Sequence, residues 1–190
     1  MLLKAPRVRK CTKTEYYKAA DLGWFGGQRV ELIDGEVIEM APQKDAHVSS
    51  VSLADYALRK VFGDGYTIRV QAPVDFGTHT QPEPDIVAVK GSPRTVLKHP
   101  KTALLVVEVS ETTLGHDRSK KARLYASRGI GDYWIVNLVK RQLDVYRKPV
   151  ADAAEPFGHK YDEVIPYLPG ESVAPLAARR SKVKVSDLLP

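Results

Sequence analysis

The apolar and polar positions near the start of the chain predict two helices and a hairpin. The expected segments are a short helix opened by a polar cap, a β-hairpin and a longer helix, over residues 12–22, 30–40 and 45–61. Asp34-Gly35 lies between two apolar-rich arms and suits the positive-φ positions of a type I′ turn. Gly63 and Gly65 are expected to end the longer helix.

Strand patterns dominate the middle of the chain. The expected strands are residues 66–74, 86–89, 103–110, 133–138 and 142–147, the last two forming a second hairpin. A helix over Asp117 to Arg128 ends at Gly129, a residue suited to the left-handed C-cap. The Pro-rich tail gives weaker strand patterns near 162–167 and 182–185. Strands before and after helices favour an α/β or α+β layer fold.

Composition indicates a globular protein with a substantial core. The 190 residues are 43% hydrophobic and 27% charged, which suits one domain spanning residues 1–190. No apolar run approaches the roughly 20 residues of a membrane helix, and the basic N-terminus lacks the apolar stretch of a signal peptide. Cys11 is the only cysteine, which excludes an internal disulfide. We expect a cytoplasmic protein without a membrane contact.

The net charge of +6 is concentrated at the two ends. Residues 1–20 carry six Lys and Arg against one acid, a balance of +5, and residues 171–190 carry four against two, a balance of +2. Solvated tails explain such clusters, and a phosphate-binding arm, here residues 1–11, is the functional alternative.

Glu108 is the most informative polar residue, because it interrupts the apolar run from Leu104 to Val109. A buried carboxylate is costly unless a cation or a metal compensates its charge, so its position favours a functional site. The alternative is that the strand ends there and the carboxylate is solvated.

Asp85 and Lys121 are the other candidates. Asp85 follows Pro84 and opens a strand, so it is either a turn residue or, if the strands of Asp85 and Glu108 are neighbours, a second carboxylate for one hard cation. Lys121 shares a helix face with Asp117 and Tyr125. It is either part of a solvated surface pair or a lysine aimed at the strand tips.

These residues together resemble a known family. The matching segments, in chain order, are Pro84-Asp85, Leu105 to Ser110, Asp117-Arg118-x-x-Lys121-x-x-x-Tyr125 and Asp132 to Val136, with Glu31 to Glu36, His47 and Arg69 to Gln71 fitting as well. Over residues 25–150 the sequence resembles the Uma2 family, endonucleases of the PD-(D/E)XK superfamily. The superfamily's usual lysine position, two residues after the second acid, holds Ser110; Lys121 matches the lysine that such sequences carry on the next helix.

The resemblance implies a restriction-endonuclease-like fold, with a mixed central β-sheet flanked by helices and hairpin additions at the N- and C-terminal sides. It implies that Asp85, Glu108 and the carbonyl of Val109 hold Mg²⁺ or Mn²⁺, with Glu31 as a further acid. Lys121 would orient or deprotonate the attacking water or counter developing charge, while Tyr125 packs the helix. The implied partner is nucleic acid, above all DNA, and the implied assembly is a homodimer.

Two other functions fit parts of the sequence. A catalytically inactive nucleic-acid-binding or protein-interaction module could keep the same fold. His116-Asp117 is the dipeptide of HD phosphohydrolases, but that assignment requires an all-helical fold and the strand-rich middle opposes it.

Overall fold

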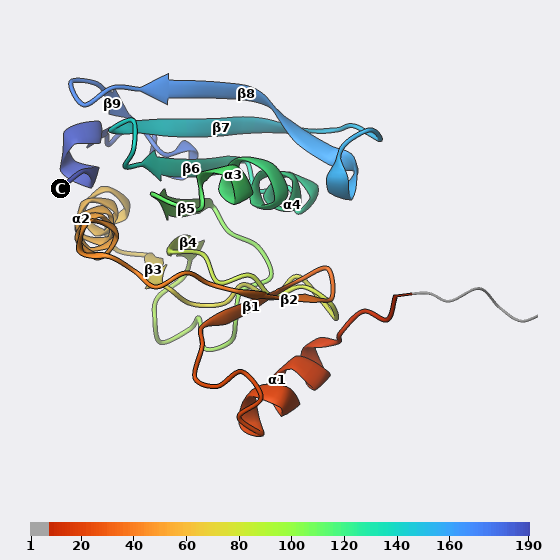
Figure 1. Ribbon diagram of the computed structural model, residues 1–190. Helices are drawn as coiled ribbons and strands as arrows, with labels where there is room; N and C mark the ends of the chain where they lie inside the picture. The colour runs from red at the N-terminus through yellow and green to blue at the C-terminus, as the bar shows by residue number, and fades with distance from the viewer. Residues whose placement is uncertain (1–7) are drawn as a thin grey trace, which may run out of the picture.

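A six-stranded mixed sheet forms the centre of the protein in a computed structural model that describes residues 8–190 (Figure 1). Its strands, in spatial order, are β3 (Tyr66–Val70), β4 (Ile86–Lys90), β5 (Leu105–Ser110), β6 (Asp132–Asn137), β7 (Gln142–Ala151) and β8 (His159–Tyr167). Only the β5–β6 pair is parallel. The expected mixed central sheet is therefore confirmed, and all but the first seven residues of the expected basic arm are described.

Helices cover both faces of this sheet (Figure 1). α2 (Asp45–Phe62) packs Val51, Ala54 and Leu58 on one face, against the odd-numbered apolar positions of β5. α4 (Ala122–Ser127) packs on the opposite face, where Val106 of β5 lies. Because side chains alternate along a strand, Glu108 lies on the α4 face together with Val106.

A hairpin and a short helix extend the molecule beyond the β3 edge of the sheet (Figure 1). β1 (Val30–Ile33) and β2 (Glu36–Glu39) pair antiparallel through Asp34 and Gly35, whose φ angles of 52° and 79° confirm the expected turn. α1 (Lys13–Asp21) precedes the hairpin and begins with a capping box between Thr12 and Glu15.

Several expected element boundaries were wrong. The strand expected to end at residue 147 continues to Ala151, and the strand expected from residue 162 begins at His159. The strand expected to reach residue 74 ends at Val70, because Gln71 takes a positive φ of 47° and Pro73 has no N–H to donate. The helix expected from Asp117 begins three residues earlier, as α3 (Leu114–His116), followed by a π-helical turn, η1 (Asp117–Lys121), that leads into α4.

The tail completes the sheet and adds a small hairpin. β8 lies along nearly the whole of β7, and β9 (Ser172–Val173) pairs with β10 (Val183–Lys184), which confirms strands at both expected places in the tail. Short 3₁₀ turns, η2 (Pro156–Gly158), η3 (Leu176–Ala178) and η4 (Val185–Leu188), connect and end these strands. Within residues 8–190, no helix combines the length and apolar character needed to cross a membrane.

Candidate active site

Two carboxylates meet where β4 begins and β5 ends. The antiparallel register pairs Ile86 with Val107, so the next positions outward, Asp85 and Glu108, lie beside each other on the α4 face of the sheet. Both residues are buried, with exposed fractions of 5% and 3%. The neighbouring strands that this site requires are therefore present, and Glu108 is not at a solvated strand end.

Glu108 is held by two donors from the helix that covers it. The Nζ of Lys121 lies 3.1 Å from Oε1 of Glu108, and the hydroxyl of Tyr125 donates to the same oxygen at 2.7 Å. Lys121 is 3% exposed and Tyr125 is fully buried, so this is an interior contact rather than a solvated surface pair.

Lys121 also contacts a third buried carboxylate. Its Nζ lies 3.4 Å from Oε2 of Glu31, a buried residue of β1 that also accepts the backbone N–H of Glu83 at 3.2 Å. Burial alone would favour the neutral amine, but the charges of Glu108 and Glu31 outweigh it and raise the pKa of Lys121 further above its ordinary value. Lys121 is therefore a permanent ammonium ion.

Asp85 has a different set of partners. Its Oδ2 accepts the backbone N–H of Val109 at 2.8 Å and lies 3.2 Å from Nε2 of His47, in the first turns of α2. Burial raises the pKa of Asp85, but the hydrogen bonds from His47 and Val109 outweigh it and lower that pKa. Burial likewise opposes protonation of His47, yet the bond to Asp85 raises the pKa of His47.

The π-helical turn η1 brings a fourth acid to the same place. Asp117 opens this turn and Lys121 closes it, and both are buried. The hydroxyl of Thr113 donates to Asp117 at 2.7 Å. Burial outweighs Lys121 and Thr113 and raises the pKa of Asp117. Single π-turns inside α-helices occur frequently at functional sites.

Of the acids of the site, Glu108 has the most strongly raised pKa. Burial, together with the charges of Asp117, Asp85 and Glu31, raises its pKa from an ordinary 4.5 to about 8, although Lys121 acts in the opposite direction. At neutral pH the carboxyl group therefore holds a proton, even beside Lys121, when no metal ion is bound. The four buried acids have a single buried lysine among them in the described chain.

The acids of this group, together with Lys121 and His47, line one cavity of about 480 Å³. Its walls are the β1–β2 hairpin, the segment that follows it, the start of α2, the ends of β4 and β5, and the η1 turn. The residues expected at the site, Glu31, Asp85, Glu108, Val109 and Lys121, all line this cavity, as do His47, His116 and Asp117. The His116-Asp117 pair therefore lines this cavity. The central β-sheet excludes the all-helical fold that an HD phosphohydrolase would require.

The donor set fits a hard divalent cation. Within residues 8–190 no group of three or more His, Cys, Asp or Glu side chains forms a ready-made ligand cage. Mg²⁺ does not require one, because it binds through one or two carboxylates and keeps several waters. The excess of buried carboxylates, one of them neutralised only by a proton, is the feature that a cation would relieve.

Three residues of the site were not assigned to it from the sequence. Tyr125 was expected only to pack its helix, and it both packs and donates to Glu108. His47 fitted the family pattern without an assigned role. Asp117 was noted on the helix face of Lys121, in the matching family segment and in the His116-Asp117 dipeptide, but not as an acid of this site. Its four-residue spacing from Lys121 is a signal that would have grouped it with the acids.

A protein-family model matches most of the chain. The Uma2 family model, described as "Putative restriction endonuclease", matches residues 15–176. The comparison with curated proteins gives no match.

Two solved structures match the chain to different extents. A "putative nuclease belonging to DUF820" from Anabaena variabilis is 18% identical in sequence, with a TM-score of 0.64 over 85% of this chain and 89% of that one. The type IIG restriction endonuclease BpuSI is 19% identical, with a TM-score of 0.38, and the match covers 66% of this chain and 14% of that chain. The first of these shows a shared architecture.

Proposed function

The chain belongs to the Uma2 family, and from that membership and the cavity we propose that it is a metal-dependent endonuclease that hydrolyses phosphodiester bonds of DNA. The observation that carries the proposal is the pair of buried carboxylates, Asp85 and Glu108, on adjacent strands beside a buried lysine. A structural salt bridge would need one acid for that lysine, and four buried acids line the cavity.

Asp85, Glu108 and the backbone carbonyl of Val109 are the groups proposed to hold Mg²⁺ or Mn²⁺. When bound, the ion would polarise an attacking water and neutralise charge on the phosphate. His47 and the N–H of Val109 fix the orientation of Asp85. Lys121 and Tyr125 fix the orientation of Glu108.

Lys121 is proposed to act through its charge. Its raised pKa keeps it protonated, so it does not remove a proton from water. An ammonium group that already lies between Glu31 and Glu108 offsets the negative charge that develops at a phosphate undergoing attack. Glu31 in turn holds Lys121 in position and contributes a further acid at the cavity wall.

The test is cleavage of plasmid, single-stranded DNA and RNA with Mg²⁺ or Mn²⁺, for the wild type, Glu108→Ala and Lys121→Ala. Lys120→Ala is the matched control, because Lys120 pairs with Glu36 at the surface. We expect metal-dependent cutting of DNA by the wild type and the control, and a loss of at least about 100-fold in the two site variants.

The alternative function predicts a different result. Retained, salt-sensitive DNA binding without cutting by the wild type would indicate a binding module on the same fold and would contradict the nuclease. The homodimer stays a prediction, which the mass of the protein in solution would test.

A further inference from the structure

A second concave surface lies next to the catalytic cavity, on the other side of β2. We call it the α1 groove and define it by Lys10, Lys18, Leu22, Trp24, Phe25 and Val37. Its volume is about 610 Å³. β2 borders both spaces: Val37 lines the α1 groove, whereas Ile38 and Glu39 line the catalytic cavity. The two hollows therefore share β2 as part of their walls.

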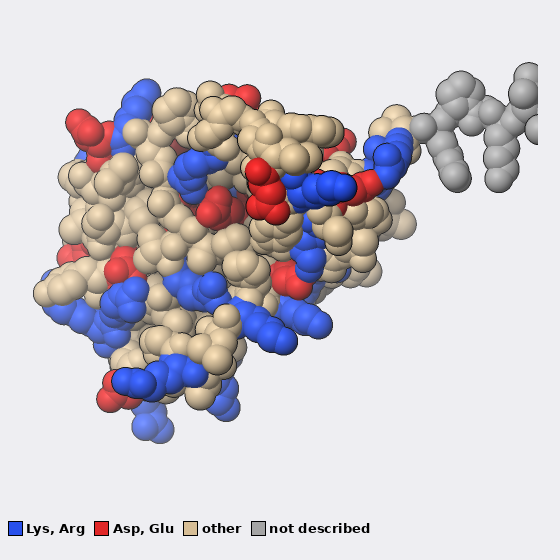
Figure 2. Space-filling model, turned by 90° about the horizontal axis from the view of Figure 1, so that it is seen from below, with Lys and Arg blue, Asp and Glu red and all other residues tan. Residues whose placement is uncertain are grey.

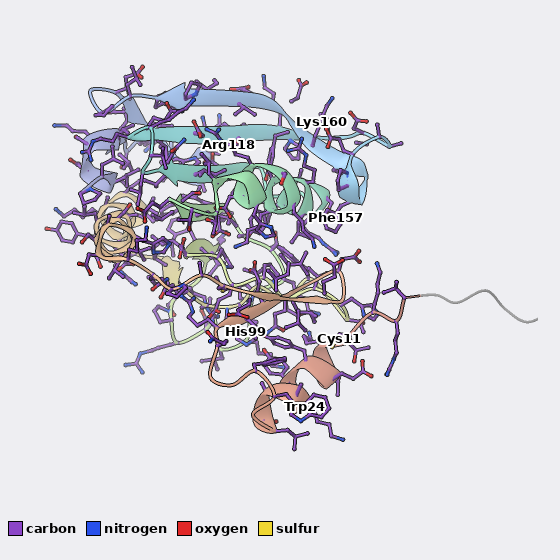
Figure 3. The ribbon with its side chains drawn as sticks, in the orientation of Figure 1. Cys11, Trp24, His99, Arg118, Phe157 and Lys160 are labelled. Atoms are coloured by element: carbon purple, nitrogen blue, oxygen red, sulfur yellow. The ribbon has the colours of Figure 1, made fainter. Side chains whose placement is uncertain are left out.

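Trp24 is the most exposed aromatic side chain of the groove. It is 75% exposed, and the neighbouring Leu22 is 59% exposed. The sticks of Figure 3 place Trp24 at the end of α1, on the outside of the molecule. Its backbone is nevertheless held, because the N–H of Trp24 donates to the carbonyl of Ala19 at 3.0 Å. A large apolar side chain on an anchored turn is typical of a binding surface.

The charges around the groove are mainly positive. Arg9, Lys10 and Lys18 line it against the single acid Glu15. Arg9 pairs with Glu15, and Lys10 pairs with Asp34 across the hairpin turn, 2.6 Å apart. Figure 2, which looks at the molecule from below the view of Figure 1, shows Lys and Arg side chains beside Asp and Glu next to the start of the described chain.

From this juxtaposition we infer that the α1 groove binds single-stranded DNA, with a base stacked on Trp24 and phosphates beside Lys10 and Lys18. Exposed aromatics between basic side chains are the recurrent means of holding unpaired bases. A duplex keeps its bases stacked on one another and offers no free face to Trp24. The inference rests on the proposed nuclease activity, because the groove would hold the DNA strand next to the catalytic cavity.

The charge balance of the cavity rim supports a separate binding surface. Glu36, Glu39 and Glu111 lie at or near the rim, and Lys44 and Lys120 are already paired with Glu111 and Glu36. Phosphate contacts supply most of the affinity of a protein for nucleic acid. The rim provides few unpaired cations for that purpose, whereas Lys18 of the adjacent α1 groove makes no ion pair within the described residues, and the pair of Lys10 with Asp34 is exposed.

Tryptophan fluorescence tests the inference directly. The chain has two tryptophans, and Trp134 is fully buried, so quenching by a bound base reports on Trp24. The probe is a dT₁₂ oligonucleotide, added in EDTA to the Glu108→Gln variant so that no cutting occurs. We expect saturable quenching by dT₁₂, little by a duplex of the same length, and none by polyglutamate. Absence of quenching by dT₁₂, or equal quenching by the duplex, would overturn the inference.

Affinity of a labelled dT₁₂, measured by anisotropy, separates stacking from charge. Trp24→Ala is expected to weaken binding about tenfold, whereas Trp24→Phe keeps a ring and stays within about threefold. Val139→Ala, at an exposed apolar position in the β6–β7 turn, is the control and should bind like the wild type. Lys18→Ala should lower the slope of log affinity against log salt by about 1. Equal affinity of Trp24→Ala and wild type would contradict the role of Trp24.

The outcomes distinguish this inference from the proposed nuclease. If the wild type cuts nothing and dT₁₂ still binds through Trp24, the groove stands and the nuclease fails. If the wild type cuts DNA and Trp24→Ala binds and cuts as well as the wild type, the nuclease stands and the groove fails. Tighter binding of the matching RNA oligonucleotide would overturn the assignment to DNA.

Discussion

The hydroxyl of Tyr125 donates to Oε1 of Glu108 at 2.7 Å, the same carboxylate oxygen that faces Nζ of Lys121 at 3.1 Å. Two donors on one oxygen fix the rotation of the carboxylate. They also leave its other oxygen available to the cavity that Glu108 lines. Tyr125 does not line that cavity, so it acts on the site only by positioning Glu108.

Replacing Tyr125 by Phe removes one of these donors and keeps the packed ring. We expect Tyr125→Phe to lower the affinity for Mn²⁺, measured by calorimetric titration, about 10- to 100-fold, which is typical for a residue that orients a metal ligand. Its cost to the free energy of unfolding should be only about 1 kcal/mol.

Tyr161→Phe is the matched control for this variant. The hydroxyl of Tyr161 donates to the carbonyl of Ile130 at 2.7 Å, in the same apolar cluster but without contact to an acid of the site. It should cost a similar amount of stability and leave Mn²⁺ affinity unchanged. An equal loss of affinity in both variants would show a general loosening of the core instead of a positioning effect.

The raised pKa of Glu108 makes both stability and metal binding depend on pH. Between its ordinary value of 4.5 and its folded value of about 8, the folded state binds one proton more than the unfolded state. The contribution of Glu108 to stability is therefore full below about pH 4.5 and is lost as pH rises to about 8. A cation must displace that proton, so Mg²⁺ affinity should rise up to about tenfold per pH unit below pH 8 and then level off.

Calorimetry checks this prediction in two ways. Titration of Mg²⁺ at pH 7, in buffers of different ionisation enthalpy, should report the release of about one proton per ion. In the metal-free protein, Glu108→Gln should flatten the fall in unfolding free energy across this pH range. Metal binding by the wild type without proton release would contradict the raised pKa.

Glu108 and Asp85 could be predicted from the sequence for a simple physical reason. An acid inside an apolar strand is costly, so Glu108 could be recognised from its neighbours alone. Asp85 required one further assumption, that its strand lies beside that of Glu108, and the register bears this out. The hairpin around Asp34-Gly35 was readable because few residue pairs suit that turn.

Other features of the site and the fold cannot be recognised from the local sequence pattern. A tyrosine on an apolar helix face looks the same whether or not its hydroxyl reaches an acid, so the bond from Tyr125 was not predictable. The π-turn of Asp117–Lys121 inserts a residue that no periodicity of so short a segment reveals. The length of β8 depends on pairing with β7 and not on its own pattern, which is interrupted by Pro166.

His47 and His99 should affect stability with opposite dependence on pH. The pKa of His47 is raised, since its bond to Asp85 outweighs its burial, whereas burial and Arg69 lower the pKa of His99. The stability contributed by His47 is full below its ordinary pKa of 6.5 and is lost as pH rises through its folded value. The contribution of His99 is gained as pH rises toward 6.5.

Urea unfolding of His47→Ala and His99→Ala, each compared with the wild type from pH 5 to 8.5 without metal, measures both effects. The loss of unfolding free energy caused by His47→Ala should shrink as pH rises. The loss caused by His99→Ala should grow as pH rises. A destabilisation by His47→Ala that grows with pH would show that His47 is held neutral and is not an imidazolium beside Asp85.

Two adjacent lysines provide the sharpest test of the buried charge cluster. Lys121 lies 3.4 Å from Glu31 and 3.1 Å from Glu108, all three buried, whereas Lys120 pairs with the exposed Glu36. Lys121→Met leaves Glu31 ionised and buried without its cation, which should cost about 3–5 kcal/mol of unfolding free energy. Lys120→Met should cost about 1 kcal/mol or less.

The double variant Glu31→Gln with Lys121→Met completes this test, because it removes the stranded carboxylate as well. Its unfolding free energy in urea should exceed that of Lys121→Met alone. With Glu31→Gln alone as the remaining member of the double-mutant cycle, the costs should give a favourable coupling between the two residues. The same variant should remain unable to cut DNA, since the ammonium that offsets phosphate charge is still missing. If Lys121→Met were no less stable than Lys120→Met, the cavity would admit enough water to solvate Glu31. The excess of buried charge that argues for a cation would then not exist.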